Sequence, residues 1–571
     1  MSQWPAKFGK LIGYGAILSG LASLAFAGHP KIAQDLSNVK PDATVDVIVQ
    51  YTHPPSDDRY RMLSRIGARH KAHLQLINAE AVTLSRRDLD ALAEDPDVAR
   101  ISSDQPVFGS LDYAIPATNA DLAAKIYGYD GTGIGIAVID SGIVDIPDLH
   151  NSSGYRVRYS QNFAGNGGGS AVDQYGHGTH VAGIVGGNGG KSTGSNFKST
   201  FRGVAPNANL INLRVLDKNG VGSDSAVIAA ITQAIALKNT YNIRVINLSL
   251  GRPVYESYTQ DPLCQAVEKA WKAGIVVVVA AGNYGRSNPG GINGYGTISA
   301  PGNDPYVITV GAMKTDGTPS RSDDTIASYS SKGPTQFDHI VKPDLVAPGN
   351  RVVSLSTAGL TLPHLYPQNN IPYSLYGVNG SAATSATYYV LSGTSMATPM
   401  VSGAAALLLQ QNPQLNPDQV KARLMKTAYK VFPTSSTAVD PTTGIAYTSS
   451  YDIFTVGAGY LDVQAALASS DTSSGPATSP SATMIVDASG KTIVSLDTGN
   501  AIWGKAIIWG TVLIWGSNTF VNGTAVLSGT ALCWGDTTLQ GFVLIWGDIL
   551  VWGDSTQAGP ELTNIAIYGE Q

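Results

Sequence analysis

Three residues with catalytic side chains each stand in a short glycine-containing motif. Asp140 ends the apolar run AVID and is followed by SG, His177 lies in GHGTHVAG, and Ser395 lies in SGTSMATP. A serine hydroxyl is a weak nucleophile, so a neighbouring imidazole must take its proton and later return it to the leaving group. A carboxylate must hold that imidazole in the right tautomer and stabilise its charged form. This combination indicates acyl transfer through a covalent serine intermediate.

A fourth residue extends this chemistry. Asn283 follows the apolar run that ends in AAG, at the end of an expected strand. Its side-chain amide can donate to the oxyanion of a tetrahedral intermediate, beside the backbone N–H of Ser395. Ser395 precedes an apolar helix, whose first N–H groups favour developing negative charge.

Each motif also has an ordinary structural explanation when it is read alone. Asp140 suits a turn cap, Ser395 suits a helix N-cap and Asn283 suits a turn after a strand. His177 and His180 form an HxxH pair that resembles part of a zinc site, but no third ligand has supporting spacing. Cys264 begins an expected helix and suits a buried small hydrophobe, with no histidine motif to make it a nucleophile.

The elements that must position these residues lie in 112–468, where apolar strands alternate with helices. Such alternation is typical of a parallel sheet covered on both faces, in which active groups gather at the carboxyl ends of the strands. The expected strands are 135–139, 210–215, 245–250, 275–280 and 306–310. The expected helices are 179–186, 225–238, 263–273 and 395–410.

Composition limits the class of protein. A chain of 571 residues with 43% hydrophobic residues is long enough for several globular domains. The net charge is −5 and no long basic run occurs, which argues against a nucleic-acid partner. The two cysteines, Cys264 and Cys533, cannot form a disulfide framework, and we place them in different domains.

The first 27 residues resemble a signal peptide. Lys7 and Lys10 precede the apolar stretch 11–25, and residues 25–27 form an A-x-A cleavage pattern. A membrane anchor is the alternative, but the stretch is short for a span and contains three glycines. We therefore expect a soluble mature protein that is secreted or extracellular.

Residues 28–111 form a separate small α+β pattern, with its core at about 45–109. Strands are expected at 45–51, 79–84 and 98–101, and an exposed basic helix at 57–74. Ser85 is expected to cap a helix that runs through Leu92, because Asp88 lies three residues further on.

The remainder divides into a linker and a repeat. Residues 469–483 are rich in Ser, Thr, Pro and Ala, which is a linker composition. In 484–571, glycines recur about every six residues, often directly after a tryptophan. This period is compatible with a β-solenoid. We favour tryptophans inside the solenoid over an exposed stacking surface for carbohydrate or cell surface. Cell-surface binding or self-association is a possible role of this region. The repeated glycines are Gly504, Gly510, Gly516, Gly523, Gly529, Gly535, Gly541, Gly547 and Gly553.

The three motifs, in the chain order Asp, His, Ser, resemble the subtilisin-like serine proteases. The resemblance covers about 112–468 and also includes GVAP at 203–206, PDLVAPG at 343–349 and GAGYLD at 457–462. It implies an α/β peptidase in which Asp140, His177 and Ser395 are catalytic and Asn283 binds the oxyanion. The substrates are then proteins or peptides.

The same resemblance identifies 28–111 as a propeptide, an intramolecular inhibitor that is cut off autocatalytically within 108–114. It implies that substrate pairs with the backbone of Gly220, Val221 and Gly222 by strand addition. Leu248, Ser249, Leu250 and Gly251 resemble the strand that lines the first specificity pocket. The family often has a second glycine next, where this chain has Arg252. No acidic residue is evident at this pocket, so we predict broad or apolar specificity.

The resemblance implies no cofactor for the chemistry. Calcium is common in the family, but the loop 187–199 has few carboxylates and does not resemble a calcium-binding loop, so a structural calcium has no local support. Two other functions fit the sequence less well. A silent binding or structural protein usually lacks a catalytic residue, whereas all four are present here. An acidic pocket would favour a processing protease with a single target, and no such pocket is evident in the sequence.

Overall fold

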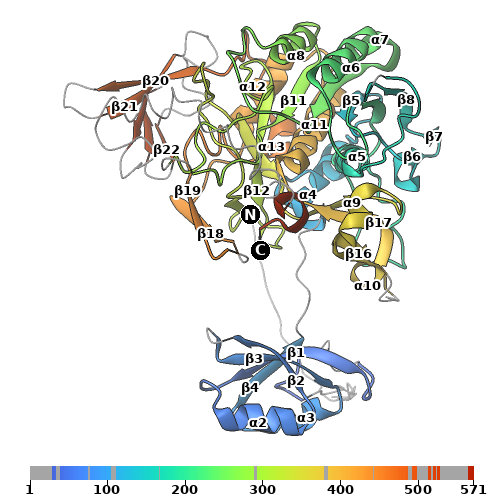
Figure 1. Cartoon of the computed structure of the whole chain (residues 1–571), viewed down its shortest axis with the longest axis vertical. Helices are drawn as coiled ribbons and strands as arrows, with labels where there is room; N and C mark the ends of the chain where they lie inside the picture. Colours follow the sequence, from blue (N-terminus) through green and yellow to red (C-terminus); the bar gives the residue numbers. More distant parts are fainter. Residues whose placement is uncertain are drawn as a thin grey trace, which may run out of the picture. The chain divides into compact units, whose positions relative to one another are not determined.

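The fold is described from a computed structural model. It describes residues 29–33, 36, 39–74, 77–103, 111–165, 167–288, 292–378, 384–440, 443–486, 492–497, 512–515, 518–521, 524–527 and 564–570. The expected signal peptide, 1–27, lies outside these ranges. The chain divides into two compact units, Met1–Val107 and Phe108–Gln571 (Figure 1). None of the helices within these ranges has the length and apolarity needed to span a membrane.

The first unit contains an antiparallel sheet of order β2-β3-β1-β4. Side chains of β1 alternate in burial from Val47 onward, with Val47 and Val49 fully enclosed against Val82 and Leu89. This alternation is what a sheet with one covered face requires. The elements are β1 (Thr44–Tyr51), α2 (Asp57–Arg65), β2 (Arg69–Leu74), β3 (Ala79–Ser85), α3 (Asp88–Ala93) and β4 (Val98–Ser103).

Two expectations for this unit are wrong. The expected helix 57–74 ends at Arg65, and β2 follows it. The side chains of β2 are nearly all exposed, so no hydrophobic alternation marks it as a strand. Ser85 does not cap α3, because it is the last residue of β3, and the residue at the N-cap position of the helix is Arg87.

The second unit is built on a sheet of eight strands. Its order is β13-β12-β11-β10-β5-β9-β8, with β14 also paired to β12, and only the pairing of β12 with β13 is antiparallel. The strands are β5 (Gly135–Asp140), β8 (Val157–Asn162), β9 (Asn209–Arg214), β10 (Ile243–Leu248), β11 (Val276–Ala280), β12 (Ile308–Lys314), β13 (Thr325–Ile326) and β14 (Leu345–Pro348).

Helices cover both faces of this sheet (Figure 1). Helices α5 (His177–Gly186) and α11 (Thr394–Gln411) pack together on β5 and the central strands. Helices α6 (Asp224–Ala236) and α8 (Pro262–Lys272) also pack together, against β5 and β11. Every side chain of β5 and β11 is consequently buried, which explains why both sequences are apolar apart from Asp140 at the end of β5. The α/β fold expected from the sequence is confirmed for this unit, with shifts of one to four residues at element ends.

Smaller elements surround the sheet. A second sheet joins β15, β17 and β16, and its strand β17 leads directly into the segment of Ser395. These elements are α4 (Leu111–Ala117), η2 (Ala123–Tyr127), η3 (Pro147–Leu149), β6 (His150–Asn151), β7 (Gly154–Tyr155), α7 (Lys238–Tyr241), β15 (Val352–Leu355), α9 (Thr361–Leu365), η5 (Pro367–Asn369), β16 (Asn370–Pro372), α10 (Tyr373–Tyr376), β17 (Thr384–Leu391), α12 (Pro417–Thr427), β18 (Ser435–Val439), β19 (Ala446–Ser450) and α13 (Val463–Ala468).

The segment 469–483 has the composition of a linker but packs onto the second unit. Ser479 is buried, and its Oγ lies 2.5 Å from Asp344 Oδ1 and 2.8 Å from Lys421 Nζ. Asp344 also binds Lys342 Nζ at 2.7 Å, so one carboxylate is the shared partner of two fully buried lysine side chains. Burial lowers the pKa of Lys421 to about 7, although Asp344 acts in the opposite direction.

In the repeat region, the described strands form an antiparallel sheet of order β20-β21-β24-β23-β22. This pairing differs from the parallel stacking of a β-solenoid. The strands are β20 (Ser481–Val486), β21 (Thr492–Asp497), β22 (Val512–Trp515), β23 (Asn518–Val521) and β24 (Thr524–Leu527). Most of the glycine–tryptophan repeat, and Cys533, lie outside the described residues.

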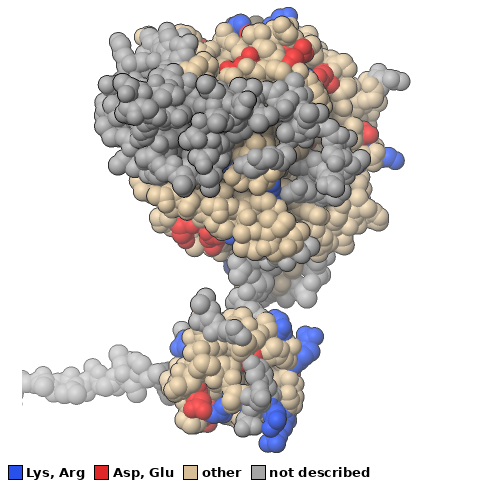
Figure 2. Space-filling model, turned by 60° about the vertical axis from the view of Figure 1, so that its left-hand side comes forward, with Lys and Arg blue, Asp and Glu red and all other residues tan. Residues whose placement is uncertain are grey.

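The surface of the second unit carries few charges. On the face in Figure 2, charged side chains are scattered over a largely uncharged surface and do not gather into one patch among the described atoms. This distribution agrees with a chain in which only 14% of residues are charged.

The buried charge cluster generates a stability prediction. Asp344→Ala should lower the free energy of unfolding by about 3–5 kcal/mol, because Lys342 and Lys421 are left without their counter-ion in the core. Urea titration of the full chain carrying Ser395→Ala, which prevents self-digestion, measures this change. Lys125→Ala is the control, since it removes the exposed pair with Asp121 and should cost no more than about 0.5 kcal/mol. Equal effects of the two variants would contradict the prediction.

Candidate active site

The predicted catalytic residues lie at the end of one strand and at the starts of two helices, and these three positions are close together. Asp140 is the last residue of β5, in the middle of the parallel sheet. His177 is the first residue of α5, and Ser395 is the second residue of α11. Because α5 and α11 pack together on the sheet, their N-termini meet at its carboxyl edge, where β5 ends.

Asp140 and His177 are joined by a hydrogen bond. His177 Nδ1 lies 2.8 Å from Asp140 Oδ1, which also accepts a bond of 2.7 Å from the backbone N–H of Ser141. Asp140 is fully buried, whereas the imidazole is partly exposed. A Cβ atom at Gly178 would stand 2.3 Å from the Gly142 carbonyl oxygen, so this close approach of strand and helix requires glycine.

The environment of His177 favours its protonated form. Burial alone lowers the pKa of the imidazole, but the charge and hydrogen bond of Asp140 outweigh it, and the pKa lies above its ordinary value. The carboxylate therefore stabilises the imidazolium that forms when the ring accepts a proton.

Asp173, which the sequence analysis did not single out, fixes the start of α5. Its buried carboxylate accepts hydrogen bonds from Thr179 N at 2.9 Å and Thr179 Oγ1 at 2.7 Å. It also accepts from Gly176 N and from Ser141 Oγ, both at 2.9 Å. Since Ser141 follows Asp140 directly, Asp173 ties the end of β5 to the helix that carries His177. A carboxylate four residues before a helical histidine is the only local signal for this role.

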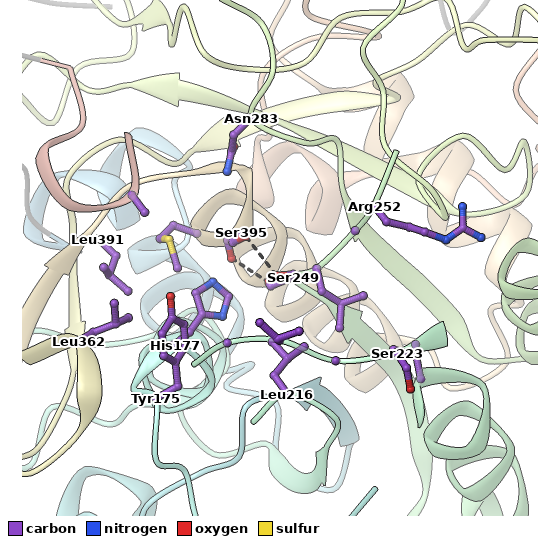
Figure 3. A pocket seen from close by; sticks show the side chains of 18 of the residues that line it. Tyr175, His177, Leu216, Ser223, Ser249, Arg252, Asn283, Leu362, Leu391 and Ser395 are labelled. Carbon is purple, nitrogen blue, oxygen red and sulfur yellow. Dashed lines mark hydrogen bonds between the residues drawn. The ribbon is translucent and has the colours of Figure 1, made fainter. Parts of the chain in front are cut away.

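Ser395 is held at the start of α11 by contacts with the end of β10. Its Oγ donates to the Ser249 carbonyl oxygen at 3.1 Å, and Ser249 Oγ donates to the Ser395 carbonyl oxygen at 2.8 Å (Figure 3). The same figure shows the His177 ring beside Ser395. Rotation about the Cα–Cβ bond of Ser395 would turn its hydroxyl toward the ring, as occurs commonly on substrate binding.

Asn283 presents its amide nitrogen to the same space. Its Oδ1 accepts from Thr394 N at 2.9 Å and from Thr394 Oγ1 at 3.0 Å, which orients Nδ2 toward the cleft (Figure 3). Gly393 adopts φ +143°, and a Cβ atom there would lie 3.1 Å from Nδ2. Glycine thus keeps the space beside this donor open. The adjacent backbone N–H of Ser395 belongs to the first turn of the helix, where no intrahelical carbonyl is available.

One cleft of about 430 Å³ is lined by His177, Asn283 and Ser395, whereas the buried Asp140 does not line it. Gly220, Val221 and Gly222 line it, and so do Ser249, Leu250 and Gly251, so these residues are available for the predicted contacts with substrate. Leu248 does not line it. As the last residue of β10, Leu248 is fully buried in the core, so its predicted contact with substrate is wrong.

The prediction that no acidic residue lies at this pocket is wrong, because Asp224 lines the cleft. The Oδ2 atom of Asp224 lies 2.8 Å from Arg252 Nε. The guanidinium also binds both oxygens of the buried Asp261, at 2.9 and 3.0 Å. Arg252, which stands where the family often has glycine, therefore pairs with Asp224 but shares its one positive charge with Asp261, so it offsets the charge of Asp224 only in part.

Two other residues considered for chemistry lie in the core. His180 is buried and its Nε2 lies 3.0 Å from the Tyr389 carbonyl and 3.1 Å from the Val352 carbonyl. Burial lowers the pKa of His180 to about 3, so the ring is neutral. Cys264 is a buried free thiol, and burial raises its pKa. No group of three or more His, Cys, Asp or Glu side chains suited to a metal ion occurs in the described part of the chain.

Comparison with known proteins agrees with this geometry. Residues 131–459 match the subtilase family. Serine protease AprX of Bacillus subtilis is 34% identical over 393 residues, which cover 66% of this chain and 82% of AprX. Subtilisin E of the same species is 34% identical over 371 residues, covering 64% of this chain and 80% of that protein. An alkaline protease of Alkalihalobacillus alcalophilus is 35% identical over 351 residues, covering 61% and 73%.

The family match, the level of identity and the arrangement of Asp140 behind His177, with His177 and Ser395 in one cleft, lead to the same assignment. The chain belongs to the subtilase family and is a subtilisin-like serine peptidase.

Proposed function

We propose that this chain is an endopeptidase that hydrolyses peptide bonds through an acyl-enzyme formed on Ser395. The observation that carries the proposal is the 2.8 Å hydrogen bond between Asp140 and His177 at the cleft that contains Ser395. A buried carboxylate paired with a partly exposed imidazole is the arrangement that general-base activation of a serine needs.

In the proposed reaction, His177 Nε2 takes the proton of Ser395 as Oγ attacks the carbonyl carbon of the scissile bond. Asn283 Nδ2 and the Ser395 backbone N–H donate to the oxyanion of the tetrahedral intermediate. His177 then gives its proton to the leaving amine, and the C–N bond breaks. Water, activated by the same imidazole, hydrolyses the ester and restores Ser395. This sequence of steps uses no cofactor.

Two backbone edges support a proposal for substrate binding. Gly220–Gly222 and Ser249–Gly251 flank the cleft, and an extended peptide can add between them as a strand. Leu216, Val227, Leu250 and Leu263 make its walls largely apolar, while the charge of Asp224 is paired with Arg252. We infer broad or apolar specificity for protein and peptide substrates.

Secretion and self-processing complete the proposal. Residues 1–27 carry the signal-peptide pattern, and residues 28–111 are proposed to be a propeptide that inhibits the enzyme until it is cut within 108–114. The separate sheet β2-β3-β1-β4 within these residues supports this proposal. The structural calcium that is common in the family stays without support from any local signature. For the repeat region, association with a cell surface or with other copies stays an expectation from the sequence.

A fluorophosphonate probe tests the nucleophile and self-processing together. The wild type should be labelled and should accumulate as the shorter, processed chain, whereas Ser395→Ala should take no label and persist as the uncut proform. Thr398→Ser, a conservative change of a buried hydroxyl one turn along α11, is the control and should behave as the wild type. A folded, processed wild type without label would contradict the peptidase proposal.

A comparison of two substitutions of Asn283 tests the oxyanion donor. Asn283→Ala should lower kcat by roughly 10²–10³ with little change in KM, because the donor acts mainly on the transition state. Asn283→Asp keeps the acceptor for Thr394 but removes the Nδ2 donor, so it should lose at least as much activity. Steady-state kinetics on one peptide substrate measures both. Wild-type kcat in Asn283→Asp would show that the residue only supports Thr394.

The raised pKa of His177 predicts the pH dependence of activity. As pH falls through this pKa the imidazole becomes protonated and can no longer accept the Ser395 proton, so kcat/KM should fall. The midpoint should lie above about pH 6.5, the ordinary imidazole value. Asp140→Asn should move the midpoint downward and lower kcat by roughly 10⁴. A pH–rate profile measures both, and an unchanged midpoint in Asp140→Asn would contradict the assigned cause.

A further inference from the structure

The segment 564–570, here called the clasp, lies against the peptidase unit although the repeat region separates it from that unit in sequence. Residues 564–568 are helical, and Ile565 and Ile567 are each only 2% exposed. In Figure 1 the clasp is the dark red turn beside α4 and α9. Both isoleucines belong to the main hydrophobic core, so the clasp is packed as firmly as the peptidase elements around it.

Polar contacts of Glu570 anchor the end of the clasp. One carboxylate oxygen accepts hydrogen bonds from Ser328 N at 2.6 Å, from Arg286 at 3.1 Å and from Ser328 Oγ. The backbone N–H of Glu570 donates to Asn350 Oδ1 at 2.8 Å, and its carbonyl accepts from Asn350 Nδ2 at 2.9 Å. A buried carboxylate with this many donors fixes the segment in one position.

Gly569, the residue before Glu570, lies too close to its neighbours for any other side chain to fit. Gly569 adopts φ +62°, and a Cβ atom there would lie 2.4 Å from Ser392 Oγ and 2.7 Å from Asn350 Oδ1. Glycine therefore lets the clasp approach the chain three residues before Ser395.

This approach brings Ala566 into the substrate cleft. Ala566 lines the same cavity as Ser395, Leu391 and Met396. Its carbonyl accepts the hydrogen bond of the Ser392 backbone N–H at 2.9 Å, so the clasp occupies a main-chain donor beside the nucleophile.

The position of Ala566 relative to Ser395 indicates which half of a substrate it would meet. In Figure 3, Ser249, Arg252 and Ser223 lie on one side of Ser395, where the proposed strand-pairing edges are. Leu391 lies on the opposite side, and the ribbon of the clasp passes next to it. If the acyl half of the peptide pairs with those edges, the leaving half must pass Leu391, Met396 and Ala566.

We propose that the clasp forms the wall of the leaving-group side of the cleft, with Ala566 as a residue that determines specificity there. The inference rests on the proposed peptidase function and adds a substrate preference to it. A wall made of Leu391, Met396 and a clasp fixed by Glu570 limits the volume available to the first residue after the scissile bond. The enzyme therefore favours peptides with a small side chain at that position.

Three substrates with the same acyl half test this proposal. Two are internally quenched peptides that differ only in the first residue after the cut, Ala or Phe, and the third is a methyl ester whose leaving methanol is too small to meet the wall. Since a hydrophobic pocket discriminates by roughly 10–200-fold per small change in size, Ala566→Phe should lower kcat/KM for the Phe peptide at least about tenfold more than for the Ala peptide. Hydrolysis of the ester should stay within about twofold.

A second variant should act in the opposite direction. Glu570→Ala releases the anchor, so kcat/KM for the Phe peptide should rise at least about tenfold relative to the Ala peptide. Tyr568→Ala is the matched control, because this side chain belongs to the clasp but is half exposed and does not line the cleft. It should leave the ratio of the two peptides unchanged.

The outcomes distinguish a failure of the clasp proposal from a failure of the proposed peptidase function. Unchanged ratios in both variants, with normal ester hydrolysis, overturn the clasp proposal alone. Faster hydrolysis of all three substrates in Glu570→Ala also overturns it, because the segment would then be a plug over Ser395 rather than a wall. A folded wild type that does not hydrolyse the ester overturns the proposed peptidase function, and this inference with it.

Discussion

The hydrogen bond between Asp140 and His177 is the contact on which the rest of the site depends. A fully buried carboxylate loses hydration, a cost that must be met by a counter-charge or by hydrogen bonds. His177 Nδ1 and the Ser141 N–H supply those bonds on one oxygen, and no partner of the other oxygen occurs among the described residues. The pair therefore gains most when the imidazole is protonated, which is the state that catalysis passes through.

Holding this pair together constrains the elements around it. Asp173 ties the end of β5 to the first turn of α5 through Ser141 and Thr179. A second polar chain fixes the nucleophile: Ser402 Oγ donates to Asn247 Oδ1 at 2.8 Å, and Asn247 Nδ2 donates to Ser249 Oγ at 3.0 Å. Ser249 then binds Ser395. The first chain joins the end of β5 to the start of α5, and the second joins the middle of α11 through the end of β10 to Ser395. Both therefore preserve the geometry where rigid elements meet.

The sequence predicts the residues whose role depends on local pattern, and it misses those whose role depends on distant contacts. Asp140, His177, Ser395 and Asn283 stand at strand or helix ends that hydrophobic periodicity marks. Ser479 lies in a stretch with linker composition, yet it contacts Asp344 and Lys421, which no local pattern can indicate. The ion pair of Asp224 with Arg252 and the position of 564–570 likewise depend on the tertiary fold. The strand β2 was missed because its exposed side chains carry no alternation.

The clasp and the oxyanion donor Asn283 are held by the same segment of the chain, residues 328–331. Arg286, which binds Glu570, follows the loop that carries Asn283, and its Nε donates to Ser328 Oγ at 2.8 Å. Three residues beyond Ser328, Ser331 donates its N–H to the Gly282 carbonyl at 3.0 Å and accepts from Tyr284 N at 3.1 Å. The segment that receives the Glu570 carboxylate is therefore the one that supports both sides of Asn283. Anchoring of the clasp orders the wall of the cleft and also strengthens the support of the group that stabilises the transition state.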